Sequence, residues 1–72
     1  MIIGIIEDDK LLNQALRLVL QKAGYRITCA HTRQEALSLM GREEDLLLVD
    51  IGLPDGNGIS LYQELKGRRE IP

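Results

Sequence analysis

The sequence feature that most restricts the fold is a short apolar run, residues 46–49, that ends on the carboxylate of Asp50. The run shows no alternation of polar and apolar residues, which is typical of a strand buried on both faces, as parallel strands are. A Leu-Pro pair and three glycines follow within eight residues. Open α/β sheets bind their ligands at the carboxyl ends of their strands. The run therefore predicts a parallel α/β sheet with a site near Asp50.

The rest of the chain alternates between strand and helix patterns. A continuous, β-branched run predicts a strand over 2–6, and weak alternation predicts another over 25–30. Apolar residues at helical spacing predict three helices. The order strand-helix-strand-helix-strand-helix requires right-handed crossovers, with helices on the faces of a parallel sheet. In the first helix, the residues expected to be buried are Leu12, Ala15, Leu16, Val19 and Ala23, with Leu11, Leu18 and Leu20 beside them.

Length and composition exclude several classes of protein. Seventy-two residues make one small domain at most, and the single cysteine, Cys29, rules out an internal disulfide and is typical of a reducing cytosol. A formal charge of −2 argues against a nucleic-acid surface, and a glycine breaks the longest basic run, residues 66–69. No apolar run approaches the roughly 20 residues of a membrane span. We therefore expect a cytoplasmic protein, or a piece of one, that binds neither nucleic acid nor membrane directly.

Acidic residues follow two of the predicted strands. Glu7, Asp8 and Asp9 come directly after the first strand, and Asp50 comes after the third. If these strands are neighbours, the carboxylates converge at one edge of the sheet, where like charges raise one another's pKa unless a cation neutralises them. An all-oxygen ligand set favours a hard ion, and open positions suit a partly hydrated Mg²⁺. A carboxylate beside such an ion can also act as a nucleophile toward a phosphoryl group.

Simpler roles exist for some of these acids. Acids after strands are common as helix caps, which is the expected role of Asp9. Asp55 is expected to be a turn residue held by the glycines around it. Taken alone, Glu7 and Asp8 would more often cap a helix or face solvent than bind a metal. Acidic residues occur at the carboxyl ends of two predicted strands, and Leu-Pro and glycine follow the second of them. This combination favours a metal-binding site.

The two motifs together resemble the receiver domain of two-component response regulators. The matching pieces are Ile5-Ile6-Glu7-Asp8-Asp9 and Val49-Asp50 followed by Leu53-Pro54 and Gly58, and their spacing also fits. The resemblance covers essentially all of the chain. It implies a flavodoxin-like (CheY-like) doubly wound parallel sheet with strand order 2-1-3-4-5. Residues 1–72 would be its amino-terminal portion, with three strands in the order 2-1-3 and three helices.

Carried over by position, the resemblance implies a phosphoacceptor signalling module rather than an enzyme. Asp50 would receive a phosphoryl group from the phosphohistidine of a sensor histidine kinase. Asp8 would bind Mg²⁺ directly and Glu7 would reach it through water, while Asp50 and the backbone carbonyl of Gly52 would complete the protein ligands. Intact receivers are usually joined to an output domain, often one that binds DNA.

Receivers have five strands, whereas the sequence pattern of residues 1–72 predicts three. The hydroxyl residue that ends the fourth strand and the lysine that ends the fifth have no counterpart, so we expect this segment to switch poorly or not at all. The third strand would then lie at an edge of the sheet, and an unpaired hydrophobic edge is a template for pairing with another chain. We therefore expect self-association through the edge formed by Leu46, Leu47, Leu48 and Val49.

Three other interpretations stay open. The first is a structural or engineered half-domain whose acidic pocket is idle. The second is an Asp-nucleophile phosphatase, although such enzymes place a second acid two residues after the nucleophile, where this chain has Gly52. The third is a nucleotide-binding half-domain, which needs a glycine-rich turn after the first strand, where residues 7–9 are acidic.

Overall fold

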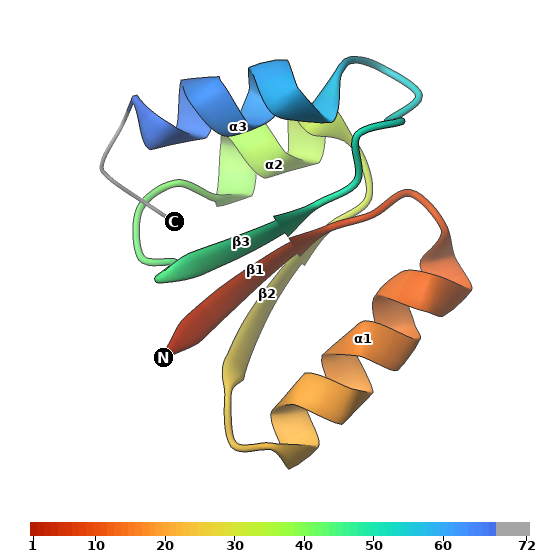
Figure 1. The fold of residues 1–72 in the computed structure, drawn as a ribbon, viewed down its shortest axis with the longest axis vertical. Coiled ribbons are helices and arrows are strands. Elements are labelled where there is room, and N and C mark those ends of the chain that lie inside the picture. Colours follow the sequence, from red (N-terminus) through yellow and green to blue (C-terminus); the bar gives the residue numbers. More distant parts are fainter. Residues whose placement is uncertain (68–72) are drawn as a thin grey trace.

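The computed structural model describes residues 1–67, which form three strands and three helices in alternation. The strands are β1 (Ile2–Ile6), β2 (Arg26–Ala30) and β3 (Leu46–Val49). The helices are α1 (Lys10–Lys22), α2 (Arg33–Leu39) and α3 (Gly58–Lys66) (Figure 1). The predicted order is therefore confirmed, and the second strand begins one residue later than predicted. The end of the basic run, residues 68–69, lies outside the described residues.

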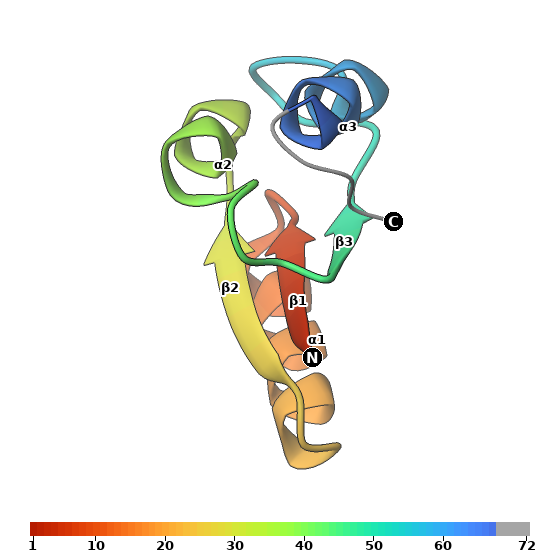
Figure 2. The same cartoon turned by 90° about the vertical axis from the view of Figure 1, so that its left-hand side faces the viewer.

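β1 is the central strand of a parallel sheet with the order β2-β1-β3, as the resemblance implied (Figure 2). The register pairs Ile6 with Ala30 on one side and with Val49 on the other. The apolar sequence of β1 suits this central place, because Ile3, Ile5 and Ile6 are all buried. The carboxyl ends of the three strands therefore lie level at one edge of the sheet.

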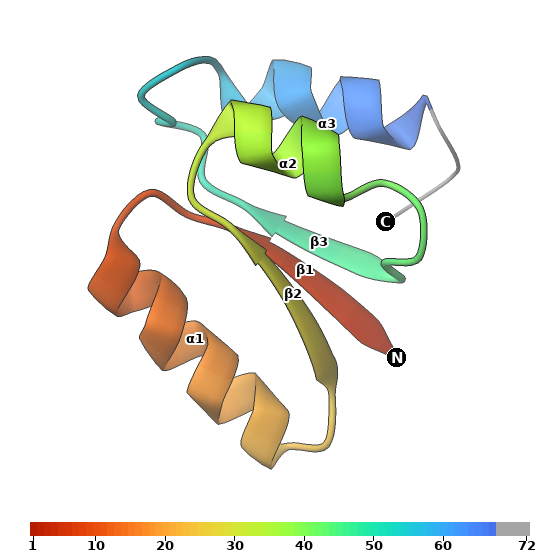
Figure 3. The same ribbon diagram turned by 180° about the vertical axis from the view of Figure 1, so that it is seen from behind.

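Helices cover both faces of the sheet, with α1 on one face and α2 and α3 on the other (Figures 1 and 3). The larger core lies between the sheet and the α2/α3 pair, and its buried members are Ile6, Ala30, Ala36, Met40, Leu47, Leu53, Leu61 and Leu65. The helical spacing of Ala36 with Met40 and of Leu61 with Leu65 predicts these buried faces of α2 and α3 correctly.

The buried face of α1 differs from the predicted one. Leu11 is 80% exposed and Val19 is 66% exposed, whereas the polar residue Asn13 is only 2% exposed. The face that meets the sheet carries Asn13, Leu16 and Leu20, which follow one another at helical spacing and are the only α1 residues that are buried or half-buried. Neither α1 nor any other helix within residues 1–67 is long and apolar enough to cross a membrane.

β3 is less buried than predicted. Leu47 points into the core and is 8% exposed, but Leu48 is 37% exposed. Successive side chains of a strand point to opposite faces, and on the face of Leu48 helix α1 packs mainly against β1 and β2 rather than β3. The expectation that residues 46–49 are buried on both faces is therefore wrong for the part of the chain that the structure describes.

Asp55 has a tertiary role that its sequence context did not indicate. Its two carboxylate oxygens accept hydrogen bonds from the N–H groups of Arg33, at 2.8 Å, and Gln34, at 3.2 Å. These are the first two N–H groups of α2, which have no partner within the helix. An ion pair between Arg33 and Glu64 links α2 to α3 beside it. Asp55 is therefore not only a turn residue, because it ties the loop after β3 to the start of α2.

We expect the Asp55 contact to make stability depend on pH. The Arg33 N–H, together with that of Gln34, lowers the pKa of Asp55 below its usual range. A depressed folded-state pKa contributes stability that is present above the unfolded value of about 3.9 and is lost as the pH falls through the folded value. Urea unfolding of wild type and Asp55→Asn should differ at pH 7, and the difference should shrink below about pH 4. A difference that stays constant with pH would contradict the assigned contact.

Candidate functional site at the carboxyl ends of β1 and β3

Strand register places two acidic residues side by side. Glu7 and Asp50 are the first residues beyond the last paired positions of β1 and β3, which are Ile6 and Val49. The Asp50 N–H continues the ladder by donating to the Ile6 carbonyl at 2.9 Å, and the Glu7 N–H donates to the Ala30 carbonyl at 3.1 Å. Both acids are therefore held by backbone hydrogen bonds at the same edge of the sheet.

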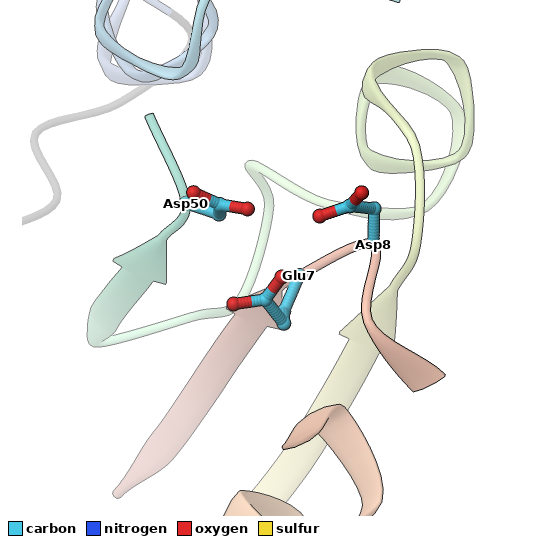
Figure 4. Close-up of side chains that lie close together, drawn as sticks. All are labelled: Glu7, Asp8 and Asp50. Carbon is cyan, nitrogen blue, oxygen red and sulfur yellow. The ribbon is translucent and has the colours of Figure 1, made fainter. Parts of the chain in front are cut away.

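Glu7, Asp8 and Asp50 form one cluster (Figure 4). One carboxylate oxygen of each residue lies within 4.8 Å of the corresponding oxygens of the other two. Glu7 and Asp50 are half-buried and Asp8 is exposed, so the cluster is open to solvent. The remaining acid, Asp9, instead caps α1, because its Oδ1 accepts hydrogen bonds from the N–H groups of Leu11 and Leu12.

Crowding separates the pKa values of these carboxyl groups. Burial raises the pKa of Glu7, and hydrogen bonding with Asp8 and Asp50 raises it further, although the Asp9 N–H opposes this by donating to Glu7 Oε2 at 3.1 Å. The Gly52 N–H lowers the pKa of Asp50 by donating to its Oδ1 at 3.0 Å, and Asp8 lowers it further. The carboxyl group of Glu7 therefore takes up a proton more readily than that of Asp50.

The donor set fits a small, hard cation. All three side chains offer carboxylate oxygens, and ligands on opposite sides of one Mg²⁺ lie about 4 Å apart. The oxygens of the cluster lie within 4.8 Å of one another. Asp8 is exposed, which leaves room for the water molecules that Mg²⁺ retains. Glu7, Asp8 and Asp50 could therefore hold a partly hydrated magnesium ion.

The loop after β3 and the start of α3 pack directly against Asp50. A Cβ atom on Gly58 would lie 2.2 Å from the Asp50 carbonyl oxygen, far inside van der Waals contact. The Gly58 N–H donates to the Ile51 carbonyl at 3.0 Å, which holds the two backbones together. At Gly52 a Cβ would meet only Asp50 Oδ1, at 3.8 Å. Gly58 therefore sets the close approach of α3 to Asp50, whereas the position of Gly52 has space for a side chain.

Asn13 is a residue of this region that the sequence motifs do not predict. Its side-chain amide contacts the backbone of Glu7 and lies behind the acidic cluster rather than in it. A signal for it exists in the sequence, because Asn13 is in phase with Leu16 and Leu20 on the inner face of α1. A polar residue in phase with a buried face must find hydrogen-bond partners inside the protein.

The fold and the acidic cluster together define a doubly wound α/β domain with a carboxylate site at the carboxyl edge of its sheet. Comparison with known families gives a match to the response regulator receiver domain over residues 3–72. The chain belongs to this family of signalling domains. The family assignment that the two acidic motifs indicated is therefore confirmed.

Relatives of known role are bacterial transcriptional regulators. The chain is 47% identical over 58 residues to the transcriptional regulatory protein PmrA of Pectobacterium parmentieri, which covers 79% of this chain and 26% of that protein. It is 36% identical over 69 residues to the KDP operon transcriptional regulatory protein KdpE of Escherichia coli K12, covering 94% of this chain and 31% of that protein. The chain thus spans less than a third of the length of either relative.

Solved structures of response regulators share the fold. A two-component response regulator from Clostridium difficile matches with a TM-score of 0.92 and 30% identity, over 100% of this chain and 60% of that one. The regulator TrrA from Thermotoga maritima, in complex with Mg²⁺-BeF, matches with a TM-score of 0.85 and 27% identity, over 96% of this chain and 61% of that one. A Burkholderia pseudomallei regulator with a phosphorylated aspartic acid, a calcium ion and citrate matches with a TM-score of 0.89 and 29% identity. This match covers 97% of this chain and 42% of that one. The chain therefore spans about half of these solved chains.

Proposed function

We propose that this chain is the phosphoacceptor part of a two-component response regulator and that Asp50 receives the phosphoryl group. The observation that carries the proposal is the convergence of Glu7, Asp8 and Asp50 at the carboxyl edge of the sheet. The lowered pKa of Asp50 supports it, because a carboxylate nucleophile must be ionised. The phosphorylated aspartic acid of the Burkholderia pseudomallei regulator and the Mg²⁺-BeF bound to the Thermotoga maritima regulator also support it.

The carboxylates have separate tasks in this proposal. An oxygen of Asp50 attacks the phosphorus of a phosphohistidine on a sensor histidine kinase, and the P–N bond breaks as the P–O bond forms. Asp8, Glu7, Asp50 and the Gly52 carbonyl would hold Mg²⁺, with Asp8 as a direct ligand and Glu7 acting through water as the family resemblance implies. When bound, the ion offsets negative charge on the phosphoryl oxygens. The chain acts as a substrate of the kinase and a carrier of the signal, not as an enzyme.

Phosphorylation and metal binding test this function together. Incubation with acetyl phosphate and Mg²⁺ should add one phosphoryl group to the chain by intact mass, and Asp50→Asn should abolish the addition. Asp8→Asn should weaken Mg²⁺ binding at least about tenfold in an NMR titration. Asp9→Asn is the matched control, because Asp9 lies outside the cluster and asparagine keeps the capping oxygen. Addition to Asp50→Asn, or none to wild type, would contradict the proposal.

The same Mg²⁺ titration distinguishes a cluster that binds the ion from an acidic pocket that does not. If the carboxylates are an inherited but unused feature, Asp8→Asn and Asp50→Asn will leave the response to Mg²⁺ unchanged. If the cluster binds the ion, both variants will lose that response while Asp9→Asn retains it.

We also propose that the protein acts in the cytoplasm and that the whole protein carries a DNA-binding output domain. PmrA and KdpE support this, because both are transcriptional regulatory proteins. The formal charge of −2 supports the view that residues 1–72 do not contact DNA themselves. We further propose that these residues are the amino-terminal portion of one receiver domain. Their match to 60% of the Clostridium difficile chain supports a portion rather than the whole.

Self-association through β3 is a further part of the proposal. Among the described residues, β3 pairs with β1 alone, so its other edge has no partner strand. Beside that edge lies an apolar cavity of about 260 Å³, lined by Leu47, Val49, Ile51, Gly58, Ile59 and Tyr62. An unpaired edge next to apolar surface favours pairing of two copies of this chain through Leu46, Leu47, Leu48 and Val49.

Sedimentation at micromolar concentration tests the β3 contact. The 72-residue chain should sediment as a dimer or larger species, and Leu48→Lys should shift it to the monomer because a charge on the strand blocks edge pairing. Leu11→Lys on α1 is the matched control, since Leu11 is more exposed and lies away from β3. A monomeric wild-type chain would refute the β3 contact. If both variants became monomeric to the same extent, the contact between the two copies would not be specific to β3.

A further inference from the structure

Asn13 is the one buried polar side chain of α1. It is 2% exposed, although its neighbour in the sequence, Leu12, is 46% exposed. An amide taken out of water costs free energy unless it forms hydrogen bonds, so its partners explain why it is there. Those partners are not on α1, and they lie at the ends of β1 and β2.

The Asn13 amide holds the backbone at the point where β1 ends. Its Nδ2 donates to the Glu7 carbonyl at 3.0 Å and to the Ala30 carbonyl at 3.1 Å. Both partners are acceptors, so the NH₂ side of the amide must face them. The Glu7 N–H donates to the same Ala30 carbonyl at 3.1 Å. Glu7 is therefore held through both its N–H and its carbonyl, although it lies beyond the last paired residue of β1.

This restraint acts on the residues of the acidic cluster. The Glu7 carbonyl belongs to the peptide that joins Glu7 to Asp8, so fixing it sets the direction in which both side chains leave the backbone. Only residues 7–9 separate β1 from α1, and the Asp9 side chain caps the helix. Metal ligands must be held within about half an ångström of their working geometry by the groups behind them.

We propose that Asn13 is a positioning residue that holds the Glu7–Asp8 peptide in the geometry that binds the cation. The inference rests on the proposed function, because it takes Glu7 and Asp8 to be the residues that hold Mg²⁺. Asn13 does not touch the ion, and it acts through the backbone. Replacing its NH₂ with an oxygen therefore weakens metal binding without changing any ligand.

Asn13→Asp and Asn13→Ser test the assignment. Aspartate has the same shape but puts an oxygen against two carbonyls, and serine can donate to only one of them. Mg²⁺ titration followed through the backbone amide signals of Asp8 and Asp50 should show affinity reduced about tenfold or more in both variants. Hydrogen exchange of the Glu7 N–H should accelerate in both, because its restraint is loosened.

Leu65→Ala is the matched control for a loss of stability alone. Leu65 is fully buried on α3, so this variant weakens the fold without touching the loop between β1 and α1. It should keep the wild-type Mg²⁺ affinity under conditions in which all variants are folded. Wild-type affinity in Asn13→Asp and Asn13→Ser, or an equal loss in Leu65→Ala, would overturn the inference. Absence of Mg²⁺ binding by the wild-type chain would overturn the proposed function itself.

Discussion

Gly58→Ala is expected to displace the backbone of Asp50 and to destabilise the chain by about 3 kcal/mol or more, at the upper end of overpacking costs. The added Cβ would lie 2.2 Å from the Asp50 carbonyl oxygen, 2.8 Å from its carbonyl carbon and 2.8 Å from the Ile51 Cα. All three atoms belong to the backbone, so no change of rotamer can relieve the contact. Either α3 or the end of β3 must move, and both support the acidic cluster.

Urea unfolding followed by circular dichroism measures this effect. The midpoint of Gly58→Ala should fall sharply, and the variant should accept less phosphate from acetyl phosphate wherever it is still folded. Gly52→Ala is the stability control in the same loop, because a Cβ there meets nothing closer than 3.8 Å. It should be neutral or slightly stabilising, by about 0.4–1 kcal/mol, since it restricts the unfolded chain. Equal midpoints for Gly58→Ala and wild type would show that the described packing is wrong.

Glu44→Ala is expected to cost about 2–5 kcal/mol, because it leaves two donors without an acceptor. Glu44 is fully buried between α2 and β3. Its Oε1 accepts a hydrogen bond from the Gly41 N–H at 2.7 Å, and its Oε2 accepts one from the Thr28 hydroxyl at 3.0 Å. Gly4 makes space for it, since a Cβ there would lie 2.9 Å from Glu44 Cγ. A domain of this size has roughly 4–11 kcal/mol of stability, so the change removes a large part of it.

Thermal and urea unfolding of three variants test the role of Glu44. Glu43→Ala is the matched control, because Glu43 is the adjacent residue and is exposed. It should change stability by no more than about 0.5 kcal/mol. Glu44→Gln keeps the shape and one acceptor oxygen, so it should lie between Glu44→Ala and wild type. Equal effects of Glu44→Ala and Glu43→Ala would mean that the buried hydrogen bonds contribute nothing.

Local patterns predicted the elements of the fold well because each element has its own periodicity. The apolar runs of β1 and β3 and the spacing of Leu61 with Leu65 in α3 depend only on neighbouring residues, and the structure places them as expected. The caps Asp9 and Thr32 were predictable for the same reason, since a cap bonds N–H groups two or three residues away. Strand order, by contrast, came from the family resemblance and not from the patterns.

Predictions about burial failed where the exposure of a side chain depends on which helices and strands pack together. The apolar residues of α1 were too numerous to define one face, and the sheet meets the face that carries Asn13. Leu48 has the same sequence environment as Leu47, but only the latter faces the α2/α3 side. Glu44 and Asp55 resemble ordinary loop acids, but Glu44 contacts Thr28, 16 residues away in the sequence, and Asp55 contacts Arg33, 22 residues away. Short-range patterns carry no information about such partners.

The sequence by itself determined that acids end two parallel strands, because an apolar run followed by a carboxylate is a local feature. It also identified Glu7, Asp8 and Asp50 as the candidate site, since the carboxyl ends of parallel strands share one edge. Only the tertiary structure decided how that site is held. Gly58 packs against the backbone of Asp50, Asn13 holds the peptide after Glu7, and Asp55 ties the loop to α2. These contacts join residues that are brought together by folding. Their strength depends on distances in the folded chain, which cannot be read from the spacing of residues in the sequence.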